Sequence, residues 1–304
     1  MMKKIARHII INYVPNILRE VITNYRYPQP VKYPVIKHLW SFRDLYLFKR
    51  QVECSYTDRN ILVISPHPDD EVIGMGATIV KHLNNGSNIT VLYMTDGRNG
   101  GDPNLTHKQV IKMRHREAML VGEKYGFKQI YWQLSDTLGK RVFNSEEFFT
   151  NRNEVVNNLV DVLDKGQYDS IFLPSFFDWH VDHFTSNKIL VDALKKTSIP
   201  KLTIYGYEVW SYIPFPNYVV DISDEFLAKK EMLTCYTSQV ENGYFQKYIQ
   251  DRGNLRFQLH LDKRRLGFAE AFLRFDKDVY TELFNDYLIK MINEDVNIYG
   301  NIVT

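Results

Sequence analysis

The sequence is poor in cysteine and contains no long uninterrupted run of hydrophobic residues. Cys54 and Cys235 are the two cysteines among its 304 residues, and they lie far apart. Two distant cysteines provide neither a disulfide framework nor the spacing of a cysteine metal site, and they suit a reducing compartment. No apolar run approaches the length of a membrane span, and no signal-peptide cleavage pattern follows the start. We therefore expect a cytoplasmic protein, with a peripheral position on the inner face of a membrane as the alternative.

Internal repeats and low-complexity tracts are also absent from the sequence. With 44% hydrophobic and 24% charged residues, the composition is that of a globular protein. The chain is long enough for one sizeable α/β core with additional elements. The formal net charge is only +2, and we expect no nucleic-acid partner.

The small net charge conceals an asymmetry between the start of the chain and the rest. Residues 1–50 contain ten Lys or Arg and two acidic residues, so their charge is 10 − 2 = +8 and the remainder carries 2 − 8 = −6. This segment is also apolar, aromatic and interrupted by prolines, which suits contact with an anionic membrane surface. The alternative is an arm that packs on its own domain or on a sister subunit of a homo-oligomer. We predict a basic extension over residues 1–58 and one larger domain over residues 59–304.

From residue 60 onward, segments typical of strands and helices alternate. Strands are expected at 60–65, 89–94, 129–132, 170–174 and 202–210, and helices at 72–83, 106–125, 148–163 and 183–196. Repeated strand–helix units predict an α/β, Rossmann-like, doubly wound and mainly parallel sheet with helices on both faces. The commonest strand order is 3-2-1-4-5, to which we add extra C-terminal strands. In that order the first and fourth strands are neighbours, and their carboxyl ends meet where ligands bind.

A polar motif follows the first of these strands at once. Pro66 and Pro68 flank His67, and two adjacent acids, Asp69 and Asp70, come next. One aspartate would suffice to cap the following helix, so the second acid and the two prolines need another explanation. Imidazole and carboxylate groups are ligands for zinc and similar ions, and a second acid can serve as a general base. We interpret the motif as half of a metal site.

The end of the fourth strand carries matching chemistry. His180, Asp182 and His183 follow that strand after a short connection. Taken alone, the two histidines could equally well be an N-terminal helix feature or packed rings as metal ligands. Because the fourth strand is expected beside the first, the two motifs together favour one shared site.

The paired segments Pro66–Glu71 and His180–His183 resemble the PIG-L/LmbE-like family of zinc-dependent N-deacetylases, which act on N-acetylglucosamine conjugates. The family includes phosphatidylinositol-glycan de-N-acetylases and the deacetylases of the mycothiol and bacillithiol pathways. The resemblance covers roughly residues 60–275 and not the first fifty-odd residues. It implies that residues 59–304 form a metal-dependent deacetylase domain.

The resemblance also implies roles for the residues of the two motifs. His67, Asp70 and His183 would bind Zn²⁺, with Fe²⁺ as another candidate ion. Asp69 would be the general base and later the acid, and a cationic His180 would stabilise the oxyanion. As supporting residues, Asp182 could hold a histidine in one tautomer, and Glu71 could do similar work or cap the helix.

Other polar residues are candidates for binding the sugar. Family resemblance places a substrate contact at Arg114, although a solvated basic helix face is an equal alternative. Asp96 and Arg98 lie at the end of the second strand, and Asp136 follows the third. Carboxylates and arginines at this edge could bind sugar hydroxyls through hydrogen bonds.

The sequence thus predicts a metal-dependent hydrolase whose partner is an amino-sugar conjugate. It would remove the N-acetyl group of an N-acetylglucosamine-type sugar that is lipid-linked, part of a polysaccharide or part of a small molecule. Acetate and a free amine would be released. The alternatives are a non-catalytic sugar- or glycolipid-binding protein of the same fold, and a metal hydrolase of another amide or of a phosphoester.

Overall fold

The computed structural model describes residues 51–52, 58–136, 146–178, 180–240 and 243–284. The basic segment 1–50 lies outside these residues, so membrane contact through it and the domain boundary at residue 58 stay predictions. Within the described part of the chain, no helix is both long and apolar enough to cross a membrane.

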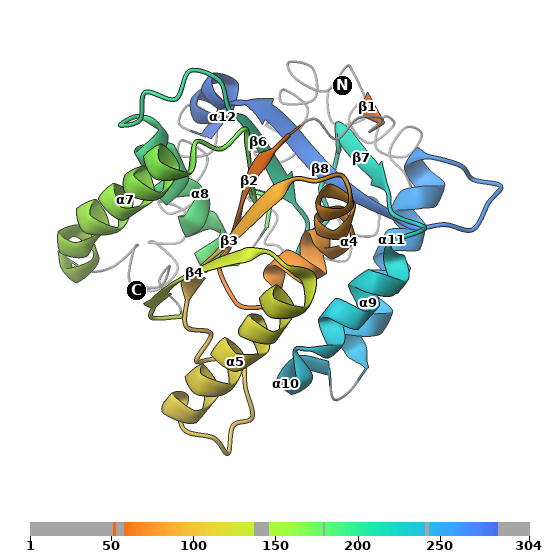
Figure 1. Ribbon diagram of the computed structural model, residues 1–304, viewed down its shortest axis with the longest axis horizontal. Helices are drawn as coiled ribbons and strands as arrows, with labels where there is room; N and C mark the ends of the chain where they lie inside the picture. The colour runs from red at the N-terminus through yellow and green to blue at the C-terminus, as the bar shows by residue number, and fades with distance from the viewer. Residues whose placement is uncertain (1–50, 53–57, 137–145, 179, 241–242, 285–304) are drawn as a thin grey trace, which may run out of the picture. The chain divides into compact units, whose positions relative to one another are not determined.

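The described strands form one mixed sheet with the order β1-β7-β8-β6-β5-β2-β3-β4 (Figure 1). Its parallel centre consists of β2 (Asn60–Ser65), β3 (Asn88–Thr95), β4 (Lys128–Leu134), β5 (Ser170–Pro174) and β6 (Thr203–Tyr207). These strands run in the order β4-β3-β2-β5-β6, which confirms the predicted order 3-2-1-4-5. The carboxyl ends of β2 and β5 are therefore neighbours.

The predicted extra C-terminal strands extend the sheet beyond β6. They are β7 (Tyr218–Asp221) and β8 (Ala269–Asp276), and β8 runs antiparallel to both β6 and β7. A short strand, β1 (Gln51–Val52), pairs in parallel with β7. The chain after β6 thus returns to the sheet and completes one of its sides.

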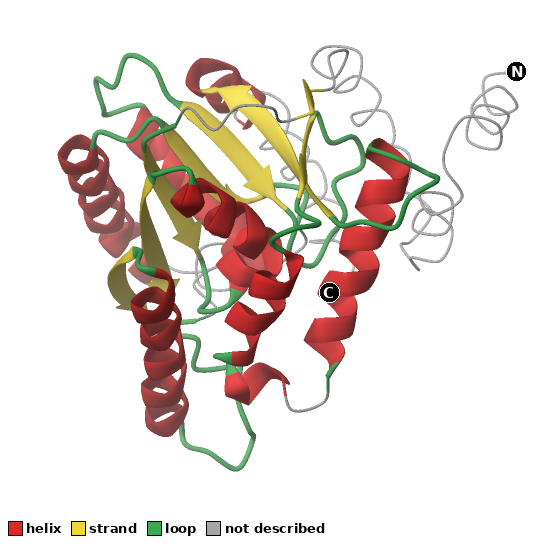
Figure 2. Cartoon of the chain, turned by 45° about the vertical axis from the view of Figure 1, so that its right-hand side comes forward, coloured by secondary structure: helices red, strands yellow, loops and turns green. Residues whose placement is uncertain are grey.

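Helices cover both faces of the sheet, as predicted (Figures 1 and 2). On one face, α7 (Glu146–Gly166) packs on α8 (Val181–Leu194). The other face carries α4 (Asp70–Asn84), α5 (His107–Tyr125), α9 (Phe226–Thr234) and α11 (Tyr244–His260). Two short helices, α10 (Thr237–Val240) and α12 (Lys277–Leu283), also occur in the described part of the chain.

Helix α4, which carries part of the first motif, is interrupted rather than continuous. Met75 has non-helical backbone angles (φ −144°, ψ 22°). Beside it, Gly74 leaves room for the ring of Tyr207, because a Cβ at Gly74 would lie 2.2 Å from the ring atom Cδ2. The sequence predicted an unbroken helix here, and the close approach of β6 explains the difference.

Buried charged groups from the C-terminal part of the chain satisfy the backbone at this interruption. The carbonyl of Ile73 accepts hydrogen bonds from Lys229 Nζ (2.9 Å) and from Arg252 (2.5 Å). Glu270 accepts from the backbone N–H of Thr78 (2.8 Å) and forms a buried ion pair with Lys229 (2.5 Å). Buried polar groups need such partners. Residues of α9, α11 and β8 thereby hold the helix that begins at the site.

Candidate active site

The turn between β2 and α4 places the first motif at the carboxyl edge of the sheet. Asp69 has a φ of 120°, a backbone conformation that costs a non-glycine residue about 1–3 kcal/mol. The buried side chain of Glu71 holds the turn, because its Oε2 accepts from the Asp69 N–H (3.1 Å) and from the Ser65 hydroxyl (2.9 Å). The other oxygen accepts from the hydroxyl groups of Tyr93 (3.0 Å) and Tyr236. Glu71 therefore supports the loop through its backbone N–H and hydroxyl contacts, rather than by contacting a histidine.

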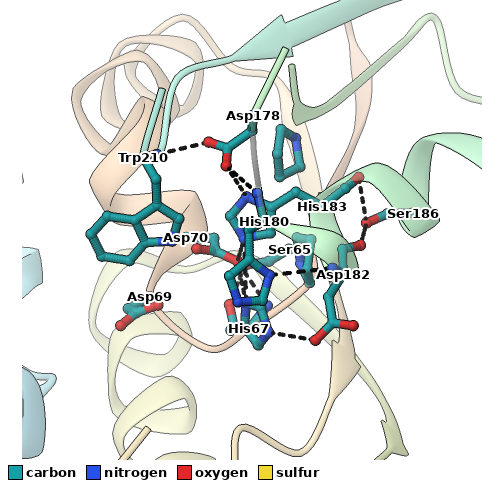
Figure 3. Close-up of polar contacts among 12 residues, drawn as sticks. Ser65, His67, Asp69, Asp70, Asp178, His180, Asp182, His183, Ser186 and Trp210 are labelled. Atoms are coloured by element: carbon teal, nitrogen blue, oxygen red, sulfur yellow. Dashed lines mark hydrogen bonds and ion pairs between the residues drawn. The ribbon is translucent and has the colours of Figure 1, made fainter. Parts of the chain in front are cut away.

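Three potential ligand atoms converge where the two motifs meet (Figure 3). Asp70 Oδ2 lies 3.1 Å from His67 Nδ1 and 3.1 Å from His183 Nε2, and the two nitrogens are 3.4 Å apart. Ligands at 2.0–2.1 Å from a tetrahedral zinc ion lie about 3.3 Å from one another. The observed triangle therefore fits one face of a tetrahedral site, with the fourth position left for water or substrate.

Carboxylates face the outer nitrogens of both imidazoles. His67 Nε2 lies 3.1 Å from Asp182 Oδ2 and 3.3 Å from Asp136 Oδ1, and His183 Nδ1 lies 3.3 Å from Asp178 Oδ1. A carboxylate on the outer nitrogen fixes the ring tautomer, so that the inner nitrogen is free of its proton and can bind a metal. Asp182, expected to hold a histidine in one tautomer, lies against His67. Asp136, predicted as a sugar contact, lies against His67.

Asp178 is a site residue that the sequence reasoning missed. Besides facing His183, it accepts hydrogen bonds from the backbone N–H groups of His180 (3.1 Å), Trp210 (2.7 Å) and Ser211 (3.2 Å). A signal was present, because this acid lies between the end of β5 and the paired histidines. Its contacts with residues after β6 could not be inferred from that spacing.

Two sets of three described residues also offer potential donor atoms that lie within 4.8 Å of one another. One set is His67, His180 and His183, and the other is His67, Asp136 and Asp182. Both share His67. The triangle that includes Asp70 is the arrangement that leaves Asp136, Asp178 and Asp182 on the outer side of the two rings.

His180 caps the start of α8, and its environment favours an uncharged ring. Its Nδ1 accepts a hydrogen bond from the Asp182 N–H (3.2 Å), so the ring proton lies on Nε2. Burial, followed by the neighbouring His183 and His67, lowers the pKa of His180. The His180 ring is therefore a neutral hydrogen-bond donor and not the cation that we expected. Its centroid lies 4.8 Å from the centroid of the His67 ring.

Asp69 is paired with a buried arginine. Its Oδ2 lies 3.1 Å from Arg114, which also donates to the carbonyl of Pro68. Arg114 is only 2% exposed, so the alternative of a solvated basic helix face is wrong. Burial raises the pKa of Asp69 to about 6, against the opposing effect of Arg114. The pair gives the site a carboxylate held in one orientation.

Asp96 and Arg98 interact with each other at the end of β3. Arg98 Nε lies 3.0 and 2.9 Å from the two carboxylate oxygens of Asp96. Asp96 also accepts from the backbone N–H of Asp136 (3.3 Å), which connects the pair to the site. The structure thus brings all predicted site residues to one edge of the sheet, in pairs that the sequence did not reveal.

Comparison with known proteins agrees with this geometry. Residues 62–194 match the PIG-L family, described as GlcNAc-PI de-N-acetylase. A diacetylchitobiose deacetylase of Thermococcus kodakarensis is 28% identical over 196 residues, which are 60% of this chain and 70% of the relative. A 1D-myo-inositol 2-acetamido-2-deoxy-α-D-glucopyranoside deacetylase of Nocardioides sp. is 42% identical over 52 residues, 16% of this chain and 17% of that protein.

Solved structures show the same fold. The N,N'-diacetylchitobiose deacetylase of Pyrococcus horikoshii has a TM-score of 0.61 at 23% identity, covering 84% of this chain and 97% of that one. GalB, a 4-carboxy-2-hydroxymuconate hydratase of Pseudomonas putida, has a TM-score of 0.57 at 19% identity, covering 71% and 95%. The fold therefore accommodates different reactions, and the site residues must decide the chemistry. Residues 62–194, the part of the chain that matches the PIG-L family, contain both motifs.

Proposed function

We propose that this protein hydrolyses the N-acetyl group of an N-acetylglucosamine-type sugar in a glycoconjugate, releasing acetate and a free amine. The observation that carries the proposal is the triangle of His67, Asp70 and His183 beside a separate buried carboxylate, Asp69. The names of the two relatives given above support the substrate class, because each is a deacetylase of an acetylated amino sugar.

His67, Asp70 and His183 would hold a divalent metal ion, which we propose to be Zn²⁺ with Fe²⁺ as the other candidate. Two imidazole nitrogens and one carboxylate oxygen are a suitable donor set for either ion. When bound, the ion would act as a Lewis acid on the acetyl carbonyl and would lower the pKa of a water molecule.

Asp69 supplies the proton transfers in this proposal. Its carboxylate accepts a proton from the attacking water as the new C–O bond forms, and it later gives that proton to the nitrogen of the breaking C–N bond. Arg114 keeps the carboxylate in place through their 3.1 Å contact. A base held in one orientation avoids the entropic cost of finding the reactive geometry.

His180 would stabilise the negative charge that develops on the acetyl oxygen. With Nδ1 accepting from the Asp182 N–H, the ring proton lies on Nε2, which we propose donates to that oxygen. A neutral donor needs no change of charge before each turnover. We propose that the remaining candidates bind the sugar: Asp96, Arg98, Arg114 and Asp136. Asp136 also contacts His67, and Arg114 also contacts Asp69.

Two substitutions in adjacent acids test the assignment. Asp69→Asn should retain the metal and reduce kcat by roughly 10²–10⁴-fold, because general acid–base help is lost. Asp70→Asn should reduce metal content first, measured by elemental analysis of the purified variant. The opposite pattern in the two variants would invert the roles of the two acids.

A direct assay separates the proposed activity from its alternatives. Acetate release should be measured from N-acetylglucosamine conjugates with different aglycones, with and without a chelator. A sugar-binding protein without catalytic activity would bind these compounds and release no acetate. A hydrolase of another amide would leave them intact and cleave other N-acyl compounds.

We further propose that residues 1–50 contact an anionic membrane. Their charge of +8, from ten basic and two acidic residues, and their apolar side chains support this. Each basic residue near such a surface contributes about 1 kcal/mol. Peripheral attachment would present a lipid-linked sugar to the site without a membrane span.

A further inference from the structure

Helix α5 carries a second buried charged residue about one turn after Arg114. Glu117 is only 4% exposed, and it lies three residues after Arg114, so the two side chains are neighbours on one face of the helix. Burial lowers the pKa of Arg114, but the charges of Asp69 and of Glu117 raise it above its usual value. Arg114 is therefore close to two carboxylates, while its ion pair among the described residues is with Asp69 (3.1 Å).

The guanidinium of Arg114 has two further donors. Its Nη2 makes the contacts with Asp69 and with the Pro68 carbonyl, whereas Nε and Nη1 are buried and have no hydrogen-bond partner among the described residues. The backbone after β3 closes over the group, because a Cβ at Gly97 would lie 3.2 Å from Nε and a Cβ at Gly100 would lie 3.8 Å from Nη2. Buried donors without a partner are costly, and a carboxylate is their strongest acceptor. A free carboxylate beside them would therefore bind there.

Three hydrogen bonds engage the carboxylate of Glu117 elsewhere. Its Oε1 accepts from the Thr237 hydroxyl (2.8 Å) and the Ser238 N–H (2.7 Å), and its Oε2 accepts from the Ser238 hydroxyl (2.7 Å). Both donor residues belong to α10, which packs on α5 (Figure 1). Neutral donors thus satisfy both oxygens of this buried carboxylate.

The segment that supplies these donors is fixed on both sides. The hydroxyl of Tyr236 donates to Glu71, and Nε2 of Gln239 donates to the carbonyl of Gly100 (2.6 Å). We call residues 236–239 the bracing segment. It contacts in succession the residue that supports the metal loop, helix α5 and the backbone that covers the guanidinium. The two outer contacts remain when the hydroxyls between them are removed, so the segment should stay in place.

We propose that the bracing segment holds Glu117 away from Arg114 and thereby leaves the guanidinium to Asp69. The inference rests on the proposed deacetylase function, in which Asp69 transfers the protons, and it adds Glu117, Thr237 and Ser238 as positioning residues. When the two hydroxyls are lost, the carboxylate of Glu117 turns to Nε and Nη1 of Arg114 and competes with Asp69. A base that loses its partner also loses its fixed orientation, which slows proton transfer.

The test combines Thr237→Val with Ser238→Ala in the full-length, metal-loaded protein. It measures kcat for acetate release from the N-acetylglucosamine conjugate that the unaltered protein cleaves best. We expect kcat to fall by about 10- to 100-fold, because the carboxylate of Asp69 is still present but misplaced. Metal content, measured by elemental analysis, should not change. Adding Glu117→Gln should restore most of the lost kcat, because an uncharged amide competes weakly for the guanidinium.

Two further measurements separate positioning from a loss of structure. Thr234→Val makes the same change on an exposed part of α9, where the hydroxyl donates to the Glu231 carbonyl (2.7 Å), and it should leave kcat unchanged. A crystal structure of the combined variant should show Glu117 within hydrogen-bond distance of Arg114 Nε or Nη1, a result that does not depend on activity. If the combined variant fails to fold, Ser238→Ala alone removes the hydrogen bond to Oε2 and should change kcat in the same direction.

The possible results distinguish this inference from the proposed function. If the unaltered protein releases no acetate from any N-acetylglucosamine conjugate, the proposed function is rejected, and the crystal structure of the variant still decides where Glu117 turns. An active protein whose combined variant keeps its kcat would overturn the inference alone. A lower kcat that Glu117→Gln does not restore would show that the hydroxyls only stabilise the segment, and it would overturn the inference too. So would a crystal structure of the variant in which Glu117 stays away from Arg114.

Discussion

Replacing Asp178 by asparagine should weaken metal binding without removing any proposed ligand. In the structure, one oxygen of Asp178 accepts from the N–H groups of Trp210 and Ser211, and the other accepts from the His180 N–H (3.1 Å) and faces His183 Nδ1 at 3.3 Å. An asparagine that keeps its oxygen toward the two N–H groups must direct its NH₂ group at Nδ1. That group would donate to Nδ1 and move the ring proton to Nε2, the nitrogen proposed to bind the metal.

The expected loss of metal affinity follows from this change of tautomer. Loss of a group that orients a metal-bound histidine typically weakens binding by about 10–100-fold, or roughly 1.4–2.7 kcal/mol. Competition between the full-length protein and a zinc chelator measures the dissociation constant directly. At saturating zinc, much of the activity should return, since the proposed ligands and Asp69 are still present.

A matched control separates this effect from a general loss of stability. Asp161→Asn makes the same chemical change on α7, where the side chain is 68% exposed and far from the histidines in the sequence. This variant should bind zinc as the unaltered protein does. If Asp178→Asn also bound zinc unchanged while remaining folded, the proposed orientation of His183 by Asp178 would be refuted.

Three further predictions concern stability and the start of the chain. Glu270→Gln should lower the free energy of unfolding by about 3–5 kcal/mol, because it leaves the Lys229 ammonium buried without its charged partner. Urea denaturation, with Thr281→Ser as the control variant, measures this change. A decrease below about 1 kcal/mol would contradict the prediction. Burial lowers the pKa of His82 to about 4, below its value of about 6.5 in the unfolded chain. The contribution of His82 to stability is therefore complete above pH 6.5 and declines by up to roughly 3 kcal/mol as the pH falls toward 4. His82→Gln should make the thermal unfolding of the protein less dependent on pH in this range. The same pH dependence in the variant and the unaltered protein would reject this prediction. The intact chain should co-sediment with anionic vesicles at low salt and release as salt screens the charges, whereas a chain beginning near Arg59 should not bind; equal binding of both forms would favour an arm that packs on protein.

The order of the sheet and the position of the site were predictable because their signals are local. Short branched apolar runs mark β2 and β5, and prolines end the first run directly before His67. Regular strand–helix alternation then leaves few topologies, and the commonest one brings the two motifs together. Local signals therefore identified the two motifs, whereas the choice of His67, Asp70 and His183 among their residues came from the resemblance to a known family.

The states of these groups were decided only by tertiary structure. The tautomer of His180 depends on a backbone N–H at the start of α8, and the orientation of His183 depends on Asp178, which itself binds the chain after β6. Arg114 resembles a surface residue in the sequence but is buried against Asp69.

The interruption of α4 is another feature that tertiary contacts decided and the local sequence did not. The sequence from 72 to 83 has the spacing of a continuous helix, and no local signal other than Gly74 indicates a break. The ring of Tyr207 occupies the space beside Gly74, and Lys229, Arg252 and Glu270 satisfy the freed backbone groups from distant elements. Local pattern determines which segments become strands and helices, because it depends on neighbours along the chain. Contacts between segments determine ring tautomers, buried charge pairs and helix breaks, because the partners are set only when the sheet and its helices have packed.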